Sequence, residues 1–173
     1  MIDLIYDEIC MVKQGKHRAR LRAGASHKPW LAPEEFKCVN CHTYVSCEPR
    51  LAGVSSRNHC PYCLWSRHLD LQKPGDRLAA CREKMEPVGL TLKKSHRKYG
   101  EERGELMLIH VCRECGKVSI NRIASDDIAG KLAELYERSL GMDGRLKGKL
   151  SACGVEPLGA TERAVVVARL FGL

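Results

Sequence analysis

Two pairs of cysteines with the spacing of metal ligands lie in the first half of the 173-residue chain. Cys38 and Cys41 form the first pair, Cys60 and Cys63 form the second, and 18 residues separate the pairs. A Cys-x2-Cys turn brings two thiolates to one side of a tight backbone loop. Two such turns supply the four tetrahedral ligands of a structural zinc site. We therefore predict that these four cysteines bind one zinc ion.

A third pair, Cys112 and Cys115, lies between two runs whose residue types are typical of strands. Residues 105–111 are rich in Leu, Met, Ile and Val, and residues 118–120 alternate between apolar and polar side chains. This pattern predicts a β-hairpin with a zinc knuckle at its tip. A second zinc ion at this knuckle needs two further ligands from elsewhere in the chain.

Cys81 is the first candidate for these further ligands, and His110 is the second. His110 lies two residues before Cys112, so the two side chains share one face of a strand. The remaining candidates are Cys47, His68 and His96.

Composition divides the chain into three parts. Residues 1–33 carry six basic and three acidic side chains, and eight of the ten cysteines lie between positions 38 and 115. We predict a basic N-terminal helix and arm in residues 1–33, a zinc-binding module in 34–127 and a helical extension in 128–173. The fold class is α+β: a small zinc-ribbon-like domain with zinc knuckles and β-hairpins, flanked by helical extensions. Aromatic residues make up only 5% of the chain, so the apolar core is thin and the metal should supply stability.

The C-terminal extension begins with a predicted helix. Ser125 is the expected N-cap, and Asp126 and Asp127 lie in the first turn, where the positive end of the helix dipole favours carboxylates. Gly141 is expected to end this helix.

The string Arg57-Asn58-His59-Cys60-Pro61 makes the chain resemble the bacterial RNHCP-domain family, which is named after this string. Matching motifs continue in residues 63–70, 81–88, 110–116 and 121–127, so the resemblance spans residues 36–127. It implies a compact zinc-ribbon-like module and favours Cys81 and His110 at the second metal site. It implies no established biochemical activity.

The charge of the chain favours a nucleic-acid partner. Lys and Arg number 29 against 21 Asp and Glu, which gives a net charge of +8. Tyr44, Tyr62, Trp65 and Tyr99 are candidates for stacking on exposed bases. We therefore expect a zinc-stabilised, non-catalytic RNA-binding protein that associates with the ribosome or another structured RNA. The expected phosphate contacts are Lys13, Lys16, Arg18, Arg20, Arg22, Lys28, Arg57, Lys93, Lys94, Arg97, Lys98 and Arg122.

Two other functions remain open at this point. One is a metal-dependent nuclease or hydrolase with His59 or His68 as general base and Asp70, Asp126 or Asp127 as metal ligands. The interpretation we favour is that these side chains support the knuckles through hydrogen bonds, because a zinc ion with four cysteine ligands has no open position. The other function is a transcription or protein-interaction adaptor that docks through residues 128–173.

The apolar runs of the sequence are too short to cross a membrane. The N-terminus lacks the basic and apolar regions of a signal peptide. We therefore expect a cytoplasmic protein with no membrane partner and no organic cofactor.

Overall fold

A computed structural model describes residues 34–93 and 104–173 of the chain. The predicted N-terminal helix and basic arm lie outside the described residues. The same holds for some of the other predicted site residues, namely His96, Lys94, Arg97, Lys98 and Tyr99.

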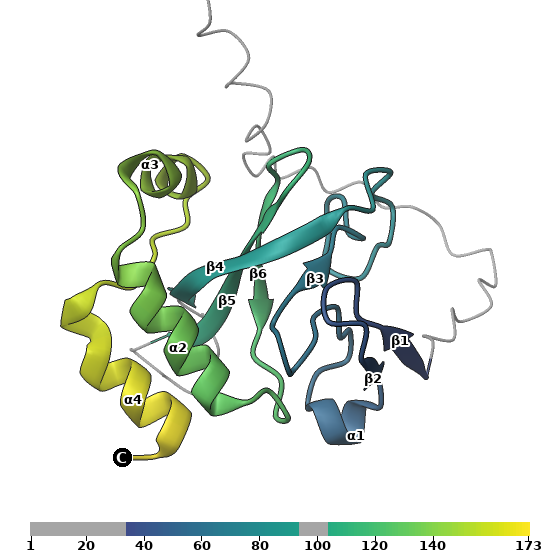
Figure 1. Cartoon of the computed structure of the whole chain (residues 1–173), viewed down its shortest axis with the longest axis horizontal. Coiled ribbons are helices and arrows are strands. Elements are labelled where there is room, and N and C mark those ends of the chain that lie inside the picture. Colours follow the sequence, from purple (N-terminus) through teal and green to yellow (C-terminus); the bar gives the residue numbers. More distant parts are fainter. Residues whose placement is uncertain (1–33, 94–103) are drawn as a thin grey trace, which may run out of the picture.

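The strands form two antiparallel sheets (Figure 1). The smaller sheet pairs β1 (Glu35–Lys37) with β2 (Tyr44–Ser46), and the short helix α1 (Pro49–Ala52) follows it. The larger sheet has the strand order β3-β4-β5-β6 and consists of β3 (Ser66–Arg67), β4 (Lys84–Lys93), β5 (Glu105–Cys112) and β6 (Val118–Arg122). The predicted α+β class and the predicted hairpin around the third cysteine pair are therefore confirmed.

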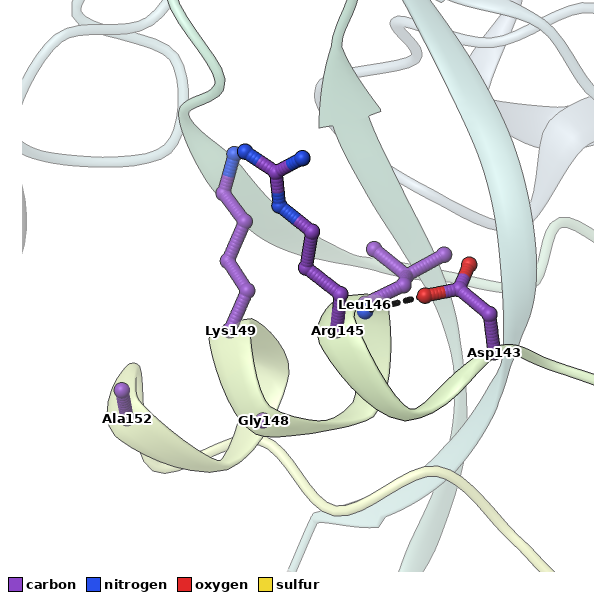
Figure 2. A pocket seen from close by; sticks show the side chains of 6 residues that line it. All are labelled: Asp143, Arg145, Leu146, Gly148, Lys149 and Ala152. Atoms are coloured by element: carbon purple, nitrogen blue, oxygen red, sulfur yellow. Dashed lines mark hydrogen bonds between the residues drawn. The ribbon is translucent and has the colours of Figure 1, made fainter.

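The described C-terminal part is helical. It contains α2 (Ala129–Leu140), α3 (Gly144–Ala152), the short 3-10 helix η1 (Ala160–Glu162) and α4 (Arg163–Phe171). A carboxylate caps α3, because Asp143 accepts a hydrogen bond of 2.9 Å from the amide of Leu146 (Figure 2). None of the helices within residues 34–93 and 104–173 combines the length and the apolar character that a bilayer span requires.

The prediction that Ser125 caps α2 is wrong. The helix begins at Ala129, its N-cap residue is Ile128, and no side chain caps it. The prediction that Gly141 ends the helix is confirmed. Asp126 and Asp127 therefore precede the helix, and their carboxylates have other partners, described below.

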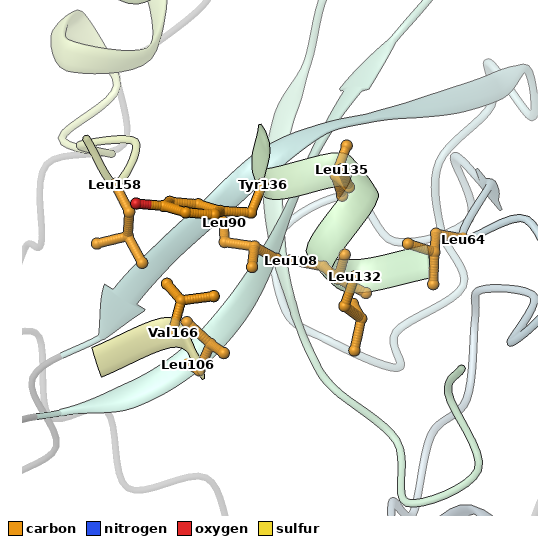
Figure 3. Close-up of a cluster of buried hydrophobic side chains, with 9 residues drawn as sticks. All are labelled: Leu64, Leu90, Leu106, Leu108, Leu132, Leu135, Tyr136, Leu158 and Val166. Atoms are coloured by element: carbon orange, nitrogen blue, oxygen red, sulfur yellow. The ribbon is translucent and has the colours of Figure 1, made fainter. Parts of the chain in front are cut away.

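The main core lies between the larger sheet and the C-terminal helices (Figure 3). Helix α2 packs on β4, and Gly89 makes this packing close, since a Cβ placed there would lie 3.1 Å from the Cβ of Ser139. The segment after α3 extends this contact, because the amide of Leu158 donates to the carbonyl of Leu90. The buried members of this core are Leu64, Leu90, Leu106, Leu108, Leu132, Leu135, Tyr136, Leu158 and Val166.

A second, smaller hydrophobic cluster surrounds the first two cysteine pairs. Its buried members are only Cys38, Val45 and Cys60, with Phe36 and Cys63 packed against them. Because two of the three fully buried members are cysteines, this half of the molecule has little apolar surface of its own to bury.

Candidate metal centres

The three Cys-x2-Cys turns have the same backbone hydrogen bonds. In each turn the amide of the first cysteine donates to the carbonyl five residues later. The carbonyl of the same cysteine accepts from the amide four residues later. For Cys38 these bonds measure 2.9 Å to the Thr43 carbonyl and 3.1 Å from the His42 amide. The residue directly after the second cysteine is left-handed in all three turns, with φ of 63° at His42, 63° at Leu64 and 71° at Gly116. The three turns are therefore equivalent zinc knuckles, as the cysteine spacing predicts.

The first and second knuckles face each other and bring four thiol groups together. The Sγ atoms of Cys38 and Cys63 lie 3.5 Å apart, and those of Cys41 and Cys60 lie 3.6 Å apart. These distances exceed the length of a disulfide bond, about 2.05 Å. They match the separation of about 3.8 Å expected for two sulfurs on one tetrahedral zinc ion with Zn–S bonds of about 2.3 Å. The first predicted ligand set therefore fits a zinc site.

The electrostatics of this cluster call for a cation. Burial raises the pKa of Cys60 and Cys63, so the protein alone holds these thiols in their protonated form. Cys41 differs: although burial opposes the change, hydrogen bonds with Thr43 lower its pKa to about 6. A bound zinc ion supplies the positive charge that four neighbouring thiolates need.

The second cluster consists of His68, Cys81, Cys112 and Cys115, whose ligand atoms all lie within 4.8 Å of one another. The Sγ atoms of Cys81 and Cys112 are 3.6 Å apart, and the Sγ of Cys115 lies 3.3 Å from Nδ1 of His68. Burial and the nearby charge of Lys117 lower the pKa of His68, which keeps its imidazole in the neutral form that binds metal. Three cysteines and one histidine are a common ligand set of structural zinc.

Strand pairing brings the two isolated ligands of this cluster together. His68 directly follows β3, Cys81 lies shortly before β4, and Arg67 pairs with Lys84 in the antiparallel ladder. The amide of His68 continues this ladder with a bond of 2.8 Å to the carbonyl of Glu83. The two clusters therefore fit two zinc sites, as predicted.

The prediction that His110 is a ligand of the second site is wrong. His110 is fully buried, and its Nε2 donates to the carbonyl of Leu64 at 2.7 Å, while Nδ1 accepts from Nδ2 of Asn121 at 2.8 Å. Burial and the charge of His59 lower the pKa of His110 to about 3, so the ring stays neutral and both nitrogens keep these partners. Cys47, another candidate, lies outside both clusters, and His68 takes the position expected for His110.

The comparisons with known proteins agree with this geometry. The family model of the RNHCP domain matches residues 33–133, which is more than half of the chain. The chain belongs to the RNHCP domain family. No curated protein and no solved structure gives a match.

The string that names the RNHCP domain makes contacts with the segment after the third knuckle. It thereby joins this segment to the first metal half, which is the part of the domain around the first cysteine cluster. Arg57 forms an ion pair with Asp126 and also contacts Asp127, at 3.4 Å. Nε2 of His59 lies 2.8 Å from Oδ2 of Asp127, and the same oxygen accepts from the amide of Ala124 at 2.7 Å. Although burial acts in the opposite direction, the hydrogen bond and charge of Arg57 lower the pKa of Asp126.

The remaining members of the string make further links to the same segment. Nδ2 of Asn58 donates to Oδ1 of Asn121 at 3.0 Å, and Asn121 in turn holds His110. The carbonyl of Pro61 accepts from the amide of Ile128. Because Cys60 belongs to the first metal cluster, all five residues of the string have a structural partner in the RNHCP domain.

This arrangement corrects the assignment of Arg57 as an RNA contact. The guanidinium side chain is 0% exposed, so a phosphate cannot reach it. Two other predicted contacts lie at the surface: Lys93 is exposed at the end of β4, and Arg122 forms an ion pair of 3.1 Å with Glu105.

The residues of the hydrolase hypothesis do not form one accessible site in the described structure. His68 belongs to the second metal cluster, and Asp70 accepts from the amides of Gly75 and Arg77 in the following loop. His59 and Asp127 form a pair whose side chains are 2% and 0% exposed, so no substrate has access to it. These contacts support the favoured interpretation that the side chains stabilise the knuckles.

Replacing His68 by alanine should lower the zinc content from two ions per chain to about one, because a structural site with three ligands is weak. His68→Cys should retain both ions, since it supplies a thiolate as the fourth ligand in place of the imidazole. His110→Gln serves as the control and should also retain both, measured by elemental analysis of the purified variants. The assignment of the second site would be contradicted if His110→Gln lost one ion. It would also be contradicted if His68→Ala retained both ions.

Proposed function

We propose that this RNHCP domain is a zinc-stabilised, non-catalytic RNA-binding protein that associates with the ribosome or another structured RNA. The observation that carries the proposal is the presence of two exposed tyrosines on the first metal half of a strongly basic chain. Tyr44 is 62% exposed and Tyr62 is 50% exposed. Exposed aromatic rings beside basic side chains are typical of surfaces on which unpaired bases stack.

The first metal centre supports this role by fixing the position of both rings. Tyr62 lies inside the second knuckle, between the ligands Cys60 and Cys63, and Tyr44 begins β2 just after the first knuckle. The ammonium group of Lys37 lies 5.9 Å from the centre of the Tyr44 ring. Rings on a metal-fixed backbone lose less conformational entropy on binding than rings on a mobile loop.

The charge of the chain supports the same partner. The net charge of +8 attracts a polyanion and makes its binding sensitive to salt, because phosphate contacts release counterions. Structured RNA exposes unpaired bases in loops and bulges beside a dense phosphate backbone. A structured RNA therefore offers both unpaired bases for the tyrosine rings and phosphate charge for the basic side chains.

Replacing Tyr44 or Tyr62 by alanine should weaken RNA binding by about 5- to 150-fold, because stacking on one base contributes about 1–3 kcal/mol. Leu51→Ala is the matched control, since Leu51 is as exposed as Tyr44 but has no aromatic ring. Binding would be measured by titration of a structured RNA with unpaired loops. Equal weakening by Leu51→Ala would argue against stacking, and no binding by the wild-type chain at low salt would exclude the proposed function.

A further inference from the structure

Helix α3 has a charge pattern that the core packing does not explain. It carries Arg145, Lys147 and Lys149, and residues 144–155 contain no acidic side chain. Only Leu150 of this helix is buried, so α3 adds little to the apolar core.

Two of the three basic side chains of α3 lie over a hollow in the surface. Figure 2 shows Arg145 and Lys149 extending from the helix in the same direction, as expected for residues four positions apart. The only carboxylate in the lining, that of Asp143, accepts from the Leu146 amide. The hollow measures about 670 Å³ and is lined by Asp143, Arg145, Leu146, Gly148, Lys149 and Ala152.

The second metal centre extends this basic surface. A Cβ placed on Gly116 would lie 2.4 Å from Nζ of Lys149, so this ammonium group lies against the third knuckle. Lys117 follows in the same turn, where its carbonyl accepts from the amide of Cys112 at 2.9 Å. Lysine and arginine side chains that meet at one surface bind phosphate oxygens through charge-assisted hydrogen bonds.

We infer that Arg145 and Lys149, together with Lys117, bind phosphate groups of an RNA strand. This inference rests on the proposed function and adds a second contact surface to the one formed by the tyrosines. The two surfaces are spatially separate, because Figure 1 shows α3 at the opposite end of the molecule from β1 and β2. Composition alone does not reveal this surface, because the seven basic and seven acidic residues of 126–173 give this part of the chain no net charge.

The test is RNA titration of the full-length chain at several salt concentrations. Arg145→Gln/Lys149→Gln should bind more weakly and flatten the slope of log affinity against log salt by about two units, one for each lost phosphate contact. The control is Lys131→Gln/Lys147→Gln, which removes the same charge at positions outside the hollow and should keep the slope. Arg145→Lys/Lys149→Arg keeps both charges and should also keep the slope.

Several outcomes would overturn the inference. An equal change in the test and control variants would show that only net charge matters, and an unchanged slope in both would exclude α3 from the interface. Loss of zinc from Arg145→Gln/Lys149→Gln would assign Lys149 to the second metal centre instead. In each of these cases the wild-type chain still binds RNA, whereas failure of the wild-type chain to bind would overturn the proposed function itself.

Discussion

Removal of the metal ions from the full-length protein should unfold the half around the first metal centre and leave β4, β5 and α2 folded. Metal binding at structural zinc sites contributes on the order of 10 kcal/mol to folding. The first metal half cannot replace this contribution, because Val45 is the only fully buried residue of its small cluster that is not a metal-ligand candidate. The larger sheet and the C-terminal part keep eight of the nine buried residues of the main core, all except Leu64 of the second knuckle, and none of the eight is a candidate metal ligand.

Hydrogen exchange resolved by segment is the measurement, with zinc content followed in parallel. After chelation, the amides of β1, β2 and the first two knuckles should lose their protection, while those of β4, β5 and α2 should retain it. Cys60→Ser should reproduce the loss around the first centre. Cys47→Ser is the control, since Cys47 lies outside both clusters. Protected β1 and β2 amides after complete zinc removal would contradict this prediction, and so would loss of protection throughout the chain.

The knuckles could be predicted from the sequence because the spacing of their cysteines is a local property. Two cysteines with two residues between them already define the turn that presents both thiolates. Cys81 could also be assigned, through its place in a family motif. Its partner His68 could not be chosen over His110, because the choice depends on the pairing of β3 with β4 around a loop. His110 lies on β5 two residues before the ligand Cys112, but its ring donates to the carbonyl of Leu64.

The partners of the two aspartates before α2 also could not be assigned from local sequence. Local reasoning explains Asp126 and Asp127 by the dipole of the following helix. In the structure the main partner of Asp126 is Arg57, 69 positions earlier in the chain. An ion pair between distant segments leaves no periodic pattern in the sequence, and Arg57 by itself resembles one more basic residue available for RNA.

Replacing Asp127 by asparagine should lower the free energy of unfolding by about 1–3 kcal/mol, because an amide in place of the buried carboxylate leaves a buried donor without an acceptor, while Asp126 still pairs with Arg57. The side chains of Asp127 and Arg57 are both 0% exposed, so water cannot take the place of the lost carboxylate. The same substitution also removes an acceptor from His59 and from the amide of Ala124. Denaturant unfolding of the zinc-loaded protein is the measurement.

Asp126→Asn is the comparison variant, and we expect it to have the smaller effect. Its carboxylate is 37% exposed, so water can solvate the changed group and the loss of stability should be smaller than for Asp127→Asn. Arg57→Met combined with Asp127→Asn should cost less than the sum of the two single variants, since the double variant buries no unpaired charge. Unfolding free energies that add without coupling, or an Asp127→Asn variant as stable as the wild type, would show that the Arg57 and Asp127 side chains do not hold the two halves of the RNHCP domain together.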